Sequence, residues 1–155
     1  MTWFLGIPTA LAFGIGSALI PVVNAEAFAL VSIAANPWLL APMVIALALG
    51  QTIGKLALFE AARRGSARFG SSRKLQTLSS SSWAERTRTA LTRRGSAVPL
   101  MLTSASLGLP PLAFVSVAAG AAGQRRRTFA LLCFIGRTAR FTALAVPVAF
   151  TTTLA

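Results

Sequence analysis

The sequence predicts an all-α integral membrane protein built from two inverted repeats, each a re-entrant helical hairpin followed by a transmembrane helix. Of the 155 residues, 55% are hydrophobic and 12% are charged, about half the charged fraction of a soluble domain. The mean hydropathy is +0.70. The 15 basic residues far outnumber the 3 acidic ones, yet residues 1–54 hold a single charged residue, Glu26. Because the basic residues lie between apolar blocks instead of over a folded surface, we expect no nucleic-acid partner.

The residue types also exclude several classes of enzyme. Histidine is absent and Cys133 is the only cysteine. Zinc sites of the Cys/His type, disulfide frameworks and His-dependent hydrolases are therefore excluded. No pairing of a nucleophile with a base can be assembled, so we expect a protein that is not an enzyme and that holds neither a metal nor a cofactor.

The chain is predicted to form a single membrane domain over 1–155, and its first apolar block is longer than one span. A bilayer core about 30 Å thick takes about 20 helical residues. We assign 1–36 to an apolar arm and re-entrant hairpin with a polar break at 21–26, and 37–62 to a transmembrane helix. A secretory signal over 1–25 is the alternative, which the absence of a positively charged start disfavours.

A strongly basic segment follows at 63–95. It holds nine basic residues and one acid, Glu85, and such an excess places a short loop in the cytoplasm. The sequence Ser82-x-x-Glu85 has the form of a capping box and predicts a helix to about Arg94, either amphipathic on the lipid surface or part of a solvated loop.

The second apolar block, 96–123, is predicted to be a re-entrant hairpin. Basic residues flank it on both sides, and Pro110 and Pro111 interrupt it at its middle, where a continuous helix would break. Two half-helices that enter and leave on one side, with the prolines at the tip, satisfy both observations. A single kinked crossing is the alternative. The remaining block predicts a transmembrane helix over 128–153.

The two halves resemble each other weakly in sequence. Val31-Ser32-Ile33-Ala34-Ala35 corresponds to Val115-Ser116-Val117-Ala118-Ala119. The first span ends in a basic segment and the last one begins at another, so the halves are expected to run in opposite directions. Inverted repeats with broken helices are typical of transporters, whose binding site lies near the midplane.

Four charged residues interrupt the apolar blocks and are the candidates for function. An ionisable group inside a membrane is a functional candidate by default, which singles out Glu26 at the first polar break. Lys55, Arg137 and Arg140 are its candidate partners. The alternatives are a surface position for Glu26 and snorkelling of the basic side chains to the interface. The spacing Gly50-x-x-x-Gly54 also permits close helix packing.

The order of several short motifs resembles a known family. The matching stretches are Ala25-Glu26, Leu49-Gly50-Gln51-Thr52-Ile53-Gly54-Lys55, Phe59 and Arg63, Arg93-Arg94-Gly95, Leu109-Pro110-Pro111-Leu112, Ala119-Gly120, Arg126-Arg127, Phe129 and Gly136-Arg137. In this order they resemble the DedA/VTT family, also called SNARE-associated Golgi proteins.

That resemblance implies two opposed re-entrant hairpins and movement of polyprenyl phosphate or phospholipid headgroups across a membrane. It also implies that Glu26 is the family's hairpin glutamate and that Arg63 and Arg137 are its basic positions. The sequence departs from the family at Gln51, where many members carry an acid, and in the second hairpin, which has no charge.

These arguments together predict a multi-pass protein of the cell membrane that acts as a lipid flippase or scramblase, with proton linkage and a role in membrane homeostasis. Glu26, Gln51 and Lys55 are the expected transport or proton-responsive residues. Arg63, Arg137 and Arg140 are the expected ligands of a lipid phosphate. The expected partners are anionic lipids or polyprenyl phosphate, and a homo-oligomer is left open. The alternative function is a scaffold that recruits partners through its basic loop without transporting anything.

Overall fold

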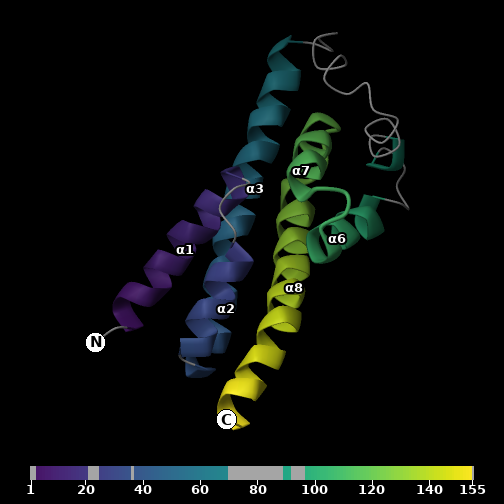
Figure 1. Ribbon diagram of the computed structural model, residues 1–155. Helices are drawn as coiled ribbons and strands as arrows, with labels where there is room; N and C mark the ends of the chain where they lie inside the picture. The colour runs from purple at the N-terminus through teal and green to yellow at the C-terminus, as the bar shows by residue number, and fades with distance from the viewer. Residues whose placement is uncertain (1–2, 21–24, 36, 70–88, 92–96, 155) are drawn as a thin grey trace. The chain divides into compact units, whose positions relative to one another are not determined.

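A computed structural model of the chain describes residues 3–20, 25–35, 37–69, 89–91 and 97–154. Within these ranges the protein is all-helical, as predicted, and contains no strand (Figure 1). The helices bounded within these ranges are α1 (Trp3–Leu19), α2 (Ala25–Ala35), the short 3-10 helix η1 (Pro37–Leu39), α3 (Leu40–Phe69), α6 (Ala97–Leu107), α7 (Leu112–Ala121) and α8 (Arg126–Leu154).

Two of the helices are long and apolar enough to cross a membrane. The apolar stretches Leu40–Gly65 of α3 and Arg126–Thr151 of α8 each contain 26 residues, or about 39 Å of helix, against a bilayer core of about 30 Å. The helices α1, α2, α6 and α7 have 17, 11, 11 and 10 residues, which corresponds to lengths between about 15 and 26 Å. Each of these four is therefore shorter than the bilayer core.

The first long helix extends beyond the range assigned to it. The predicted span 37–62 corresponds to η1 and the first part of α3, but α3 continues to Phe69. An ion pair one helical turn long, Glu60 Oε1 to Arg64 Nε at 3.1 Å, lies across the expected boundary, and such pairs favour a continuous helix. The predicted span ends where the sequence changes from apolar to basic residues, but the helix continues through that change.

Much of the predicted basic loop lies outside the described residues. The capping box Ser82-x-x-Glu85 falls there, as does all of the expected amphipathic helix up to Arg94 except residues 89–91. The last long helix, α8, covers the predicted range 128–153 and begins at Arg126.

The chain divides into two compact units. Unit 1 consists of residues 1–54 and 134–155, and unit 2 of residues 55–133. Unit 1 contains α1, α2 and η1, and unit 2 contains α6 and α7. Each unit also holds part of α3 and part of α8. The relation of the two halves as inverted repeats stays a prediction.

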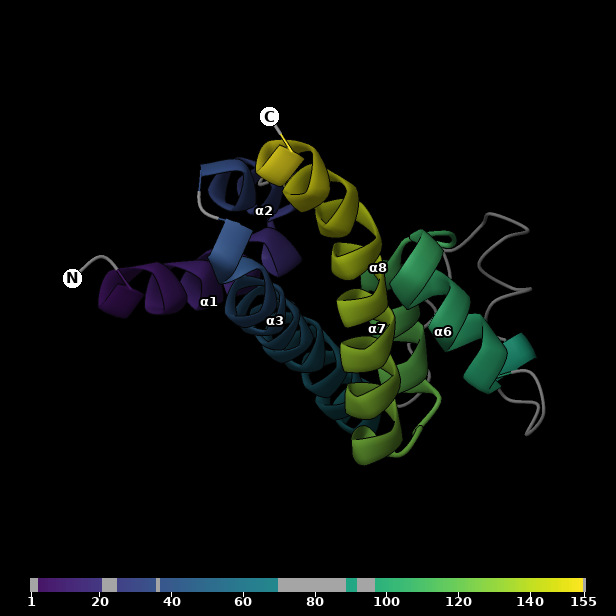
Figure 2. The ribbon, with the colours of Figure 1, turned by 90° about the horizontal axis from the view of Figure 1, so that it is seen from below.

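The core of unit 1 forms where α2 and the first part of α3 meet the C-terminal part of α8, which lie beside one another in both views (Figures 1 and 2). Its fully buried side chains include Ile33, Leu47 and Phe141. Phe13 of α1 stacks on Phe28 of α2 with ring centroids 4.4 Å apart. Apolar burial of this kind contributes about 1.5–3 kcal/mol for each large side chain.

Small residues bring α1 and α3 into backbone contact within unit 1. Ala10, Gly14 and Ala18 recur every fourth residue on α1, and Ala46, Gly50 and Gly54 do so on α3. A Cβ atom added to Gly14 would lie 2.8 Å from the Leu47 carbonyl oxygen, and one added to Gly54 would lie 2.5 Å from the Ala18 Cβ. The close packing expected at Gly50-x-x-x-Gly54 is therefore present, and it is the packing mode typical of membrane helices.

In unit 2 the short helices α6 and α7 share a core with parts of α3 and α8. Phe59 of α3 stacks on Phe129 of α8 with centroids 4.8 Å apart. A Cβ on Gly120 of α7 would collide with the Phe59 carbonyl oxygen. The single cysteine, Cys133, is buried in the same core.

The break between α6 and α7 falls at residues 108–111, where the two prolines predicted it. Gly108 has a φ of 80°, in the left-handed region that glycine adopts without a steric cost, and this ends α6. Pro111 then precedes α7 at the N-cap position. The buried Ser104 hydroxyl donates a hydrogen bond of 2.6 Å to the Pro110 carbonyl oxygen, which ties the break back to α6.

Candidate functional site

The candidate site in unit 1 is centred on an ion pair between Glu26 and Arg140. The Arg140 Nε donates to Glu26 Oε1 at 2.6 Å, and the two side chains are 25% and 31% exposed respectively. Glu26 lies in the first turn of α2, where the helix dipole favours a negative charge. The sequence predicted Lys55, Arg137 and Arg140 as candidate partners of Glu26. The structure brings Arg140 into contact with Glu26, although 114 residues separate the two in the chain.

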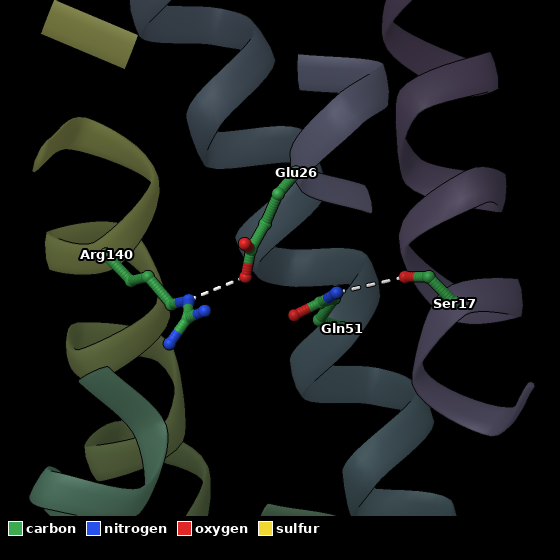
Figure 3. Close-up of polar contacts among 4 residues, drawn as sticks. All are labelled: Ser17, Glu26, Gln51 and Arg140. Carbon is green, nitrogen blue, oxygen red and sulfur yellow. Dashed lines mark hydrogen bonds and ion pairs between the residues drawn. The ribbon is translucent and has the colours of Figure 1, made fainter. Parts of the chain in front are cut away.

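A second polar chain connects α1 and α3 beside this pair (Figure 3). Gln51 Nε2 of α3 donates to the Ser17 hydroxyl of α1 at 3.0 Å. The Ser17 hydroxyl in turn donates to the Gly14 carbonyl oxygen at 2.9 Å. Gln51 is 6% exposed, and in Figure 3 its side chain lies between Ser17 and the Glu26–Arg140 pair.

Two buried side-chain oxygens of unit 1 have no hydrogen-bond partner within the described ranges. They are Gln51 Oε1 and Thr138 Oγ1. Thr138 lies four residues after Phe134 and three before Phe141, both of which pack in the core of unit 1, so its side chain is on the same face of α8. Buried polar atoms are almost always hydrogen-bonded in native proteins, so a polar ligand that reached either oxygen would be stabilised there.

The charges of unit 1 leave one positive charge in excess. Residues 1–54 and 134–155 contain Glu26, Arg137 and Arg140 and no other charged side chain. Arg137 and Arg140 are three residues apart on α8, and residues at this spacing are neighbours on a helix surface. The net charge of unit 1, with these three charged side chains, is therefore +1.

The remaining predicted site residues belong to unit 2. Lys55 is 6% exposed, so its side chain is buried rather than extended toward water. Arg63 is exposed. Pro110 is buried and Pro111 is exposed at the break between α6 and α7.

Two polar residues of the unit 1 site were missed in the sequence. Ser17 and Thr138 are small hydroxyl residues in apolar helices, and such residues commonly bond to their own helix backbone. The only sequence signal for Thr138 is its position between Arg137 and Arg140. Ser17 carries no signal beyond its place one turn after a glycine, because its contact with Gln51 depends on how α1 packs.

Nothing in the described parts of the chain forms a metal site. No group of three or more Cys, Asp or Glu side chains comes together in those ranges. The polar groups that the site brings together are the guanidinium of Arg140, the carboxylate of Glu26, the amide of Gln51 and the hydroxyl of Ser17. These groups suit hydrogen bonding to an anionic group.

Comparisons with known proteins identify no relative. No protein-family model, no curated protein and no solved structure matches the chain.

Proposed function

We propose that this chain is an integral membrane protein that moves a lipid phosphate headgroup, of a polyprenyl phosphate or a phospholipid, across the bilayer as a flippase or scramblase. The observation that supports this most directly is the Glu26–Arg140 ion pair at 2.6 Å between the helices α2 and α8. A charged side chain at the centre of a membrane helix costs about 2.5–3.5 kcal/mol on insertion scales. A pair of such residues in contact is expected where a membrane protein handles a charged substrate.

The surface of the helices supports a bilayer location. Ile45, Leu49 and Ile53 form an exposed stripe along α3, and Leu131 and Ile135 are exposed on α8. Soluble monomers rarely expose contiguous apolar patches of this kind. The short helices α1, α2, α6 and α7 suit re-entrant segments, because none of them reaches the length of a full crossing.

The proposed mechanism is an exchange of partners at Arg140. A phosphate headgroup that enters unit 1 competes with the Glu26 carboxylate for the Arg140 guanidinium, and Arg137 offers a second guanidinium one turn away. Glu26 keeps its expected role in this exchange as the transport or proton-responsive residue. The acyl or prenyl chain stays in the surrounding lipid throughout.

Gln51 and Lys55 keep their predicted transport role in this proposal. They lie four residues apart on α3 and are both buried, so they form a polar line along one face of that helix. Arg63, exposed on the same helix, is proposed to contact lipid phosphate at the end of the path.

The test is transport in proteoliposomes with a fluorescent polyprenyl phosphate and a fluorescent phospholipid. Glu26→Gln and Arg140→Gln remove one charge each from the pair and are expected to slow transport by about tenfold or more. Glu60→Gln and Arg64→Gln make the same changes in an exposed pair on α3 and are the matched controls. The proposal fails if the wild-type protein moves neither lipid, or if all four variants behave as the wild type does.

The scaffold hypothesis makes the opposite prediction. It expects no transport, no effect of Glu26→Gln, and loss of partner recruitment when Arg86, Arg88, Arg93 and Arg94 are neutralised. Pull-down of membrane partners with this quadruple variant, next to the transport assay, separates the two functions.

A further inference from the structure

The Gln51 amide has a fixed orientation, which follows from counting protons. A serine hydroxyl has one proton to donate, and Ser17 gives it to the Gly14 carbonyl oxygen at 2.9 Å. Ser17 Oγ can therefore only accept from Gln51, so the atom of Gln51 that lies 3.0 Å away must be the amide nitrogen. The backbone of α1 thus dictates which end of the Gln51 amide faces α1.

The amide oxygen of Gln51 is consequently presented on the opposite side. In Figure 3 this oxygen is directed toward the Glu26–Arg140 pair. It is buried and accepts no hydrogen bond from any residue that the structure describes. Leaving a buried acceptor unsatisfied costs about 1–3 kcal/mol, so a ligand that supplies a donor at this position gains affinity.

We infer that the ligand of unit 1 is a phosphate headgroup that carries its own hydrogen-bond donor. This inference rests on the proposed function and narrows its substrate class. The negative phosphate oxygens face Arg140 and Arg137, while the donor of the headgroup bonds to Gln51 Oε1. A phosphate oxygen placed against the amide oxygen would be repelled, so a headgroup without a donor leaves Gln51 unsatisfied.

Two lipid chemistries supply such a donor. A phosphomonoester, such as phosphatidic acid or a polyprenyl monophosphate, carries a P–OH group when it is singly ionised. An ethanolamine phosphodiester carries an ammonium group. A choline phosphodiester has neither, and it is therefore the natural negative comparison.

The experiment compares three acyl-labelled fluorescent lipids in proteoliposomes of phosphatidylcholine at pH 6, where about half of a phosphomonoester keeps its hydroxyl. The probes are phosphatidic acid, phosphatidylethanolamine and phosphatidylcholine, and transbilayer movement is read as quenching by dithionite. The variant Gln51→Met keeps the size of the side chain and removes the acceptor. Gln124→Met is the matched control, because Gln124 bonds the Leu91 carbonyl oxygen in unit 2.

Wild type is expected to move at least one donor-bearing lipid about tenfold faster than phosphatidylcholine, the effect of one hydrogen bond to a charged group. Gln51→Met should reduce this ratio to near one, and Gln124→Met should leave it unchanged. Gln51→Glu keeps an acceptor and adds a negative charge, and it identifies the donor. If the donor is an ammonium, this variant still moves phosphatidylethanolamine. If the donor is P–OH, this variant no longer moves phosphatidic acid.

The outcomes separate this inference from the proposed function. No movement of any lipid by the wild-type protein overturns both. Equal movement of all three lipids, or discrimination that Gln51→Met leaves intact, overturns the donor requirement while lipid transport stands.

Discussion

The contact between α1 and α3 is tested by two glycines that lie two residues apart on α1. Alanine at either position gains about 1 kcal/mol of helix propensity. A Cβ at Gly14 would lie 2.8 Å from the Leu47 carbonyl oxygen and 3.1 Å from the Gly50 Cα, whereas a Cβ at Gly16 would have nothing within 4 Å. Gly14→Ala and Gly16→Ala therefore differ in packing and in little else.

The size of the difference follows from these distances. Carbon atoms pack best at about 3.5–4.0 Å, so α1 must move away from Gly50 by about 0.4–0.9 Å to accept the methyl group of Gly14→Ala. Overpacking of this kind costs about 1–3 kcal/mol. Because both variants gain the same helix propensity, the overpacking cost alone separates them, and Gly14→Ala is expected to be less stable than Gly16→Ala by about 1–3 kcal/mol.

The measurement is thermal unfolding in detergent, followed by circular dichroism of the helices. At about 2–4 °C for each kcal/mol, the midpoint of Gly14→Ala should lie about 2–12 °C below that of Gly16→Ala. Gly16→Ala itself should match or exceed the wild type. Equal midpoints for the two variants would show that α1 and α3 do not pack through these glycines.

Three further predictions follow from single contacts. Glu26→Arg and Arg140→Glu each place two like charges together and should destabilise the protein, while the double variant restores a pair of opposite charges. A double-mutant cycle, with the free energy of unfolding measured in urea, should give a coupling of at least about 1 kcal/mol. An additive result would contradict the ion pair. Ser104→Ala removes the buried hydrogen bond across the α6–α7 break and should cost about 1–3 kcal/mol. Ser106→Ala removes a hydrogen bond to the Leu102 carbonyl oxygen of the same helix and should cost less than about 0.5 kcal/mol. Equal losses would refute the role of the break. Cys133, which is 2% exposed, should react with a maleimide only on unfolding, and rapid labelling of the native protein would show that the unit 2 core is open.

The local features of the fold could be predicted from the sequence because they depend on local chemistry. Pro110 and Pro111 cannot continue a helix, and the helical break at 108–111 is where they lie. The apolar blocks around Gln51 and Arg137 are long enough for a span and form α3 and α8. The helix α3 continues past residue 62, where the predicted span ends, to Phe69. Glu60 and Arg64 form an ion pair one turn apart across that boundary.

The contacts of the candidate site could be predicted only in part. Glu26 and its possible cations stand out as charges in apolar sequence, but the contact between Glu26 and Arg140 depends on how α8 returns to α2. The bond from Gln51 to Ser17 depends on the close approach of α1 and α3. Such contacts between distant segments leave no periodic pattern in a single sequence.

The division of the chain between the two units also sets an order for its biogenesis. Unit 2 is one continuous stretch that is complete once residue 133 has been translated, whereas unit 1 needs residues 134–155 as well as 1–54. At about 5–20 residues per second, the ribosome takes about 4–16 s to pass from residue 54 to residue 134. Throughout that interval Glu26 has been translated and Arg140 has not, so the ion pair of unit 1 can form only late in synthesis.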